Sequence, residues 1–121
     1  MHTPAPVPSR IELKARSKEL AVHYPDGECF ELSAEYLRVH SPSAEVRGHG
    51  FGQERLQVGK RLVGIDGVEP VGNYGLKLIF DDGHDTGIYT WQYLRDLCLN
   101  RERYWQDYLQ RLTAANASRE P

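Results

Sequence analysis

The sequence predicts an α+β domain with an antiparallel β-sheet of short strands, one short internal helix and two C-terminal helices. The first observation behind this is that apolar and polar residues alternate in several short segments, a period typical of half-buried strands. The second is that turn sequences rich in Gly, Asp and Pro separate these segments. The third is that near the C-terminus the apolar spacing changes to i, i+3, i+4 and i+7, which indicates an amphipathic helix.

The first third of the chain is predicted to form an antiparallel meander. The alternating segments that we expect to become its strands are 11–15, 20–24 and 29–32. Pro25-Asp26-Gly27 predicts a turn between the last two, because proline fixes φ and glycine accepts a positive φ.

A short helix is predicted over 34–39. Ser33 is the expected N-cap, and the spacing of Leu32 and Leu37 around it is that of a hydrophobic staple. The helix should end before Pro42, because the residue before a proline avoids the α region.

The second half begins with a glycine-rich stretch and continues into clearer patterns. Short strands are expected within 58–71, a strand over 76–80, a hairpin turn at Asp82-Gly83 and a returning strand at 88–89. Thr90 should cap the next helix, and Asn100 a final helix. The apolar stripe of that final helix consists of Trp105, Tyr108, Leu109 and Leu112.

The length of 121 residues suits one domain. We expect a proline-rich flexible tail over 1–9, the folded domain over 10–113 and a second flexible tail over 114–121.

Composition argues against several function classes. The formal net charge of −2 gives no clustered basic face for nucleic acid. No apolar run is long enough for a membrane span, and the first residues do not resemble a signal peptide. Cys29 and Cys98 form no CxxC pair or disulfide framework, so we expect reduced thiols in a cytoplasmic protein.

His84 is the sharpest candidate for chemistry, because imidazole beside carboxylates is typical of zinc or iron ligation. It follows Asp81-Asp82-Gly83 and precedes Asp85. The same residues also describe an ordinary exposed turn, and no paired-ligand motif accompanies them. His40 and His49 are the other loop histidines that we consider as candidate metal ligands.

A second candidate is a loop rich in hydrogen-bond donors within 36–50. It could bind an anion or a protein partner, or it could be a well-solvated surface loop. The residues of this predicted interaction loop are Arg38, His40, Ser41, Ser43, Glu45, Arg47 and His49.

No catalytic residue is predicted, because the enzyme templates fit poorly. The serines lack a GxSxG elbow, and no carboxylate pair is arranged as acid and base. His84-Asp85 lacks the spacer of the HxD pair in a non-haem iron site.

Two stretches together resemble a known family. They are LRVHSPSAEVRGHG at 37–50 and PVGNYGLKLIFDDGHDTGIYTWQYL at 70–94. Both are similar to the domain-of-unknown-function 971 family, also called the gamma-butyrobetaine hydroxylase-like N-terminal domain, here as a stand-alone bacterial-type member. The likeness spans nearly the whole predicted folded part.

The resemblance implies a zinc site that is degenerate in this chain. The family carries a Cys-x-Cys-x-x-Cys cluster after the first helix and a later histidine. Laid on this sequence, the cysteine positions become Ser41, Ser43 and Val46, while the histidine falls at His84. Two hydroxyls and a valine do not replace three thiolates.

The resemblance also implies a setting for the protein. In full-length hydroxylases this domain precedes an iron- and 2-oxoglutarate-dependent catalytic domain, which we do not find here. Elsewhere it is fused to Mrp-type ATPases that carry iron–sulfur clusters. The leading hypothesis is therefore a non-catalytic accessory module for an iron–sulfur or iron-dependent protein partner. The alternatives are a metal-binding protein that uses His84 to hold zinc or iron, and a small enzyme.

Overall fold

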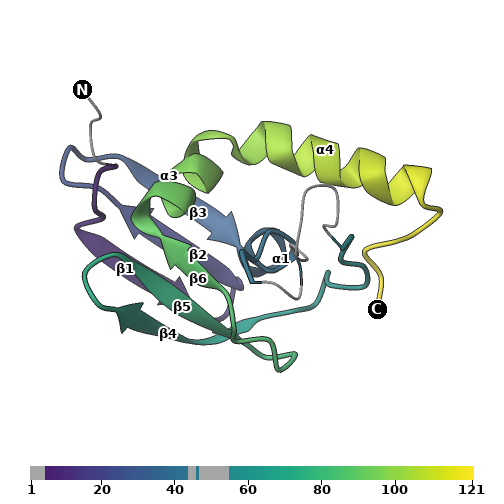
Figure 1. The fold of residues 1–121 in the computed structure, drawn as a ribbon, viewed down its shortest axis with the longest axis horizontal. Helices are drawn as coiled ribbons and strands as arrows, with labels where there is room; N and C mark the ends of the chain where they lie inside the picture. The colour runs from purple at the N-terminus through teal and green to yellow at the C-terminus, as the bar shows by residue number, and fades with distance from the viewer. Residues whose placement is uncertain (1–4, 44–45, 47–54) are drawn as a thin grey trace.

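The computed structural model describes residues 5–43, 46 and 55–121, and Figure 1 shows their arrangement. Six strands and three helices are assigned within these residues. In chain order they are β1 (Arg10–Lys14), β2 (Glu19–His23), β3 (Cys29–Ser33), α1 (Ala34–Val39), β4 (Ile65–Val71), β5 (Gly75–Phe80), β6 (Ile88–Thr90), α3 (Trp91–Leu99) and α4 (Arg101–Ala114). The predicted α+β class is thus confirmed.

The antiparallel strands form two three-stranded sheets, β1-β2-β3 and β4-β5-β6. Each sheet is a meander, so neighbours in sequence are also neighbours in space. The register of β2 and β3 places Leu20 opposite Leu32 and Val22 opposite Phe30, which keeps their apolar side chains on matching faces. Strand β1 also lies beside β4, so the two sheets adjoin.

Local sequence explains where the helices start. Ser33 caps α1 by accepting a hydrogen bond from the Tyr36 amide, and Thr90 caps α3 by accepting one from the Tyr93 amide. The prediction that the Asn100 side chain caps α4 is wrong. Asn100 stands at the start of α4, but its side-chain amide donates to Asp96 instead of capping the helix.

The core is shared by both sheets, α1 and α3. Its fully buried leucines come from distant parts of the chain: Leu20, Leu32, Leu37, Leu76, Leu78, Leu94 and Leu97. Burial of each contributes about 1.5–3 kcal/mol relative to exposure. Helix α4 adds Tyr108 and Leu112 to a smaller cluster with Val39, so this helix is held against the end of α1.

The C-terminal segment, for which a flexible tail is predicted over 114–121, makes backbone hydrogen bonds to the domain. The backbone amide of Gly59 donates to the Ser118 carbonyl at 3.0 Å, and that of Arg61 to the Arg119 carbonyl at 3.0 Å. The reason is that the chain turns back after α4 and lies along the segment before β4 (Figure 1). Near the other end, Ser9 extends the β1–β2 pairing, because its backbone amide donates a hydrogen bond to the His23 carbonyl.

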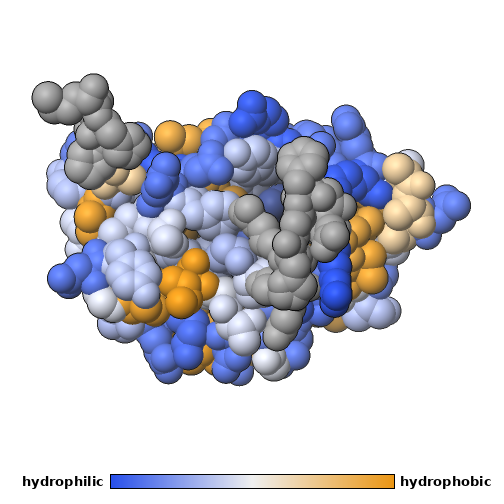
Figure 2. Space-filling model, viewed as in Figure 1, coloured by the Kyte–Doolittle hydropathy of each residue, from blue (hydrophilic) through white to orange (hydrophobic). Residues whose placement is uncertain are grey.

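The surface shown in Figure 2 is mostly hydrophilic, with hydrophobic residues in separate small groups. Among the described residues, no helix is both long enough and apolar enough to cross a membrane.

Candidate functional site

The segment after α1 meets the connection between β5 and β6 at a buried group of polar side chains. Ser41 Oγ lies 2.8 Å from His84 Nε2, and Ser43 Oγ lies 3.3 Å from the same nitrogen. We call these three residues the serine–histidine cluster. Their exposed fractions are 0%, 6% and 5%, so these contacts are made almost without solvent.

The β5–β6 connection fixes the position of His84 through its backbone. The His84 carbonyl accepts from the Phe80 amide at 3.0 Å, and the His84 amide donates to Asp82 Oδ1. Gly83 supplies the positive φ that the predicted turn requires. Gly87 lies so close to Ser41 that an added Cβ would collide with its hydroxyl, so the two segments pack tightly here.

A second polar contact joins the same two segments. Arg38 Nε donates to Asp82 Oδ2 at 2.9 Å, and the Arg38 side chain is only 8% exposed. Lys60 Nζ reaches the same oxygen at 2.9 Å. Partial burial opposes the charge on Asp82, but hydrogen bonds from Lys60 and Arg38 outweigh it and lower the pKa of this carboxyl.

The described members of the predicted interaction loop are buried or half-buried. Arg38, Ser41 and Ser43 are buried, and their polar atoms contact other parts of the chain. His40 is half-buried, with Nδ1 2.8 Å from the Tyr36 carbonyl and its ring stacked on Tyr104. The remaining members, Glu45, Arg47 and His49, lie outside the described residues.

The two described candidate metal ligands, His84 and His40, have different surroundings. His84 lies beside the hydroxyls of Ser41 and Ser43, whereas His40 packs against the rings of Tyr36 and Tyr104. Across 5–43, 46 and 55–121, no group of three or more His, Cys, Asp or Glu side chains is placed to hold an ion.

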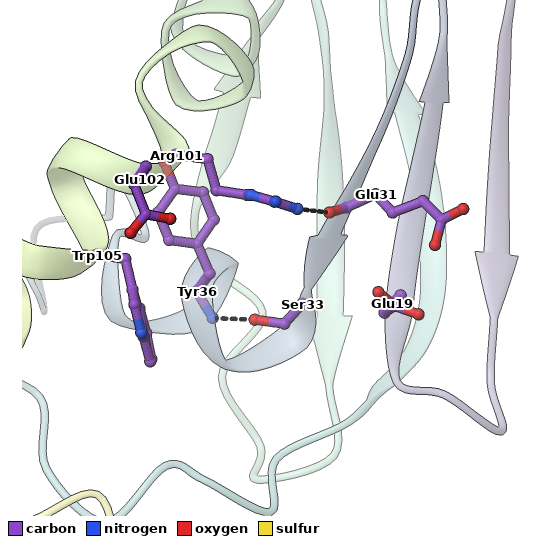
Figure 3. Close-up of a pocket in the computed structure, with 7 residues that line it drawn as sticks. All are labelled: Glu19, Glu31, Ser33, Tyr36, Arg101, Glu102 and Trp105. Carbon is purple, nitrogen blue, oxygen red and sulfur yellow. Dashed lines mark hydrogen bonds between the residues drawn. The ribbon is translucent and has the colours of Figure 1, made fainter.

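A separate pocket of about 240 Å³ opens between the β2–β3 sheet and the starts of α1 and α4 (Figure 3). Three acidic residues and two aromatic residues are among those that line it. The residues that line the pocket are Glu19, Glu31, Ser33, Tyr36, Arg101, Glu102 and Trp105.

The charges of this pocket are mostly negative. Its one cation, Arg101, donates to the backbone carbonyl of Glu31 at 2.7 Å instead of pairing with a carboxylate. Lys14 contacts Glu31 from outside the pocket at 3.1 Å. The rings of Tyr36 and Trp105 meet edge to face, with centroids 6.5 Å apart. An acidic rim over an aromatic wall suits a cationic group.

This pocket is not predictable from the sequence. Glu19 and Glu31 lie on neighbouring strands, whereas Glu102 and Trp105 lie on α4, some seventy positions later. No motif links segments so far apart, and each glutamate by itself is an ordinary surface residue.

Comparison with known proteins finds one matching family and several similar solved structures. The family described as "Gamma-butyrobetaine hydroxylase-like, N-terminal" matches residues 11–95. No curated protein matches the chain. Two solution structures determined by NMR are 51% and 49% identical, with TM-scores of 0.86 and 0.83. The alignments cover 98% and 100% of this chain and 93% and 92% of those chains.

A crystal structure from Acidithiobacillus ferrooxidans is also similar. It is 39% identical with a TM-score of 0.63, over 74% of this chain and 90% of that one. It is described as a protein of unknown function in the domain-of-unknown-function 971 family.

Proposed function

This chain belongs to the gamma-butyrobetaine hydroxylase-like, N-terminal family, and from that premise we propose that it is a non-catalytic module that docks a protein partner. The observation that supports docking is the acidic pocket between the β2–β3 sheet and α4 (Figure 3). The proposed occupant is a lysine or arginine side chain that projects from the partner.

The chemistry of the pocket favours such a side chain. Glu19, Glu31 and Glu102 attract a cation, while Trp105 offers contact to its apolar stem. Arg119 lies over Trp105, with its guanidinium 5.1 Å from the ring centroid. This internal contact supports the proposal, because a guanidinium already packs against the indole within the chain.

The class of partner is proposed from the family resemblance. Members of the family are joined to iron-dependent oxygenase domains or to ATPases that carry iron–sulfur clusters. We therefore propose that the partner is an iron–sulfur or iron-dependent protein that presents a basic side chain to this pocket.

The test is charge reversal in the pocket. The Glu19→Lys/Glu102→Lys variant and the wild type are each used as bait in extracts of the source cells, with quantitative mass spectrometry of the captured proteins. A partner that uses the pocket is enriched by the wild type and reduced at least about tenfold by the variant, which corresponds to the loss of about 1.4 kcal/mol of binding free energy. The captured protein is then purified and its affinity measured directly.

The matched control is Glu69→Lys, which reverses a charge on β4 whose side chain is 56% exposed. This control should retain the partner, and circular dichroism should show that all variants are folded. Equal capture by the wild type and the pocket variant would contradict the proposal, as would a purified partner with no iron and no cluster.

A further inference from the structure

The serine–histidine cluster occupies the position where the family resemblance implies a zinc site. The four positions concerned are 41, 43, 46 and 84. The structure brings Ser41 and Ser43 to His84 Nε2, and Val46 lines the same small pocket as Ser41. All four side chains are buried, with exposed fractions between 0% and 6%.

The donor chemistry of these residues does not fit zinc. Zinc sites in proteins are built from cysteine thiolates, histidine nitrogens and carboxylates. Here one imidazole is accompanied by two neutral hydroxyls and an aliphatic side chain. Neither hydroxyl carries the negative charge that a buried dication needs for compensation.

The shorter of the two contacts has the length of a hydrogen bond and not the separation of two ligands of one ion. Two ligands of a tetrahedral zinc, with bonds of about 2.0–2.3 Å, lie roughly 3.3–3.7 Å from each other. Ser41 Oγ is 2.8 Å from His84 Nε2, the length of a direct hydrogen bond. Ser43 Oγ, at 3.3 Å, adds a weaker contact to the same atom.

We infer that in this chain a metal-free hydrogen-bonded cluster, Ser41–His84–Ser43, replaces a zinc ion and holds together the two segments that the ion would join. It joins the segment after α1 to the β5–β6 connection, beside the Arg38–Asp82 ion pair and the tight contact of Gly87 with Ser41. This inference is independent of the acidic pocket, and either can fail without the other.

The inference has two separate parts that experiments can address. The first is that the wild type is stable without metal. The second is that the backbone still holds the four positions at the geometry of a metal site, so that thiolates placed there would bind zinc.

The second part is tested by the Ser41→Cys/Ser43→Cys/Val46→Cys variant, purified without a histidine tag under reducing conditions. Zinc is added, the excess is removed by gel filtration, and bound metal is measured by mass spectrometry. We expect about one zinc per chain and a rise in Tm of at least about 5 °C. Cobalt in place of zinc should give the absorption bands of a tetrahedral thiolate site.

The matched control adds His84→Ala to the three cysteines. It should bind zinc at least about tenfold more weakly, because one of four ligands is lost. A triple-cysteine variant that is folded by circular dichroism and yet binds no zinc would overturn the claim about geometry.

The first part is tested on the wild type itself, so it stands even if the cysteine variant does not fold. Tm is measured with excess chelator, without additions and with added zinc. The three values should agree within about 1 °C. Stoichiometric metal in the purified wild type, or a fall in Tm on chelation, would overturn the inference.

Discussion

Five polar residues are buried among the described residues, and each has an internal partner. Glu35 binds Arg119, Arg38 binds Asp82, and Ser41 and Ser43 both contact His84. A buried polar group left without a partner costs about 1–3 kcal/mol, so these pairs specify which segments come together. They join residues more than forty positions apart, which is why the burial of Arg38 and the serines could not be predicted from the sequence.

The buried thiol of Cys98 makes the free energy of unfolding depend on pH in the alkaline range. Burial raises its pKa from 9.0 to about 11, so the folded chain holds this proton more tightly than the unfolded chain does. The resulting stability is complete below about pH 9 and is lost as the pH rises toward about 11. Urea unfolding at a series of pH values should show the free energy of unfolding falling by up to about 1.4 kcal/mol per unit from this group.

The contribution of Cys98 is isolated by comparing how steeply the free energy of unfolding changes with pH in different variants. In this pH interval, the free energy of unfolding of Cys98→Ala should fall less steeply than that of the wild type. Cys29→Ala removes an exposed thiol and serves as the matched control. Identical slopes for the wild type and Cys98→Ala would show that the thiol is not the source of the pH dependence.

At the scale of single elements, local sequence controls where helices begin. Ser33 and Thr90 were predicted as caps, and both accept the expected amide hydrogen bond three residues later. Asn100 fits the same sequence rule but is drawn to Asp96, whose carbonyl and carboxylate both lie within 3.0 Å of its amide nitrogen. A cap can thus be predicted from sequence only where no tertiary or neighbouring acceptor competes for it.

The cap of α3 provides a direct test. Thr90→Ala removes the acceptor for the Tyr93 amide, which lies 3.1 Å from Thr90 Oγ1. We expect the free energy of unfolding to fall by about 1 kcal/mol in urea denaturation. Thr90→Ser keeps the hydroxyl, so its free energy of unfolding should remain within about 0.5 kcal/mol of the wild-type value. Equal losses for both variants would mean that the threonine methyl, and not the cap, is responsible.

The strands show the same dependence on local signals. Where period-two alternation is clear, as in β1, β2 and β5, the predicted segments and the observed strands agree within a few residues. Between 58 and 71 the pattern is weak, and several short strands were expected. The structure has instead one seven-residue strand, β4, with a register shift between Ile65 and Gly67. Pairing with β5 selects this strand, because backbone hydrogen bonds to a neighbour outweigh the weak local preference.

At the scale of the whole molecule, the C-terminal segment closes the fold. Arg119 makes a bidentate ion pair with Glu35, with N–O distances of 2.7 and 2.8 Å. The Glu35 side chain is 6% exposed and the Arg119 side chain 39%. The same guanidinium lies over Trp105, so one residue connects α1, α4 and the terminal segment.

Removal of this arginine should therefore destabilise the whole domain. Arg119→Ala leaves the buried Glu35 carboxylate without its partner. Because Arg119 is partly solvated, we expect a loss below that of a fully buried pair, about 1–3 kcal/mol in urea unfolding. Arg111→Ala, an exposed arginine in the same part of the chain, should change stability by less than about 0.5 kcal/mol. A wild-type stability for Arg119→Ala would mean that the terminal segment does not support the fold.

The sequence by itself determined the class of the fold, most of the strands, two helix caps, the turn at Gly83 and the family. These depend on periodicity, turn chemistry and long local motifs, all of which act over a few neighbouring residues. Only the tertiary structure decided that the strands divide into two sheets, that His84 meets two serines, that three glutamates share a pocket and that Arg119 returns to Glu35. Each of these brings together residues from distant segments, and such contacts form because core packing and buried polar pairing are satisfied by the whole chain at once.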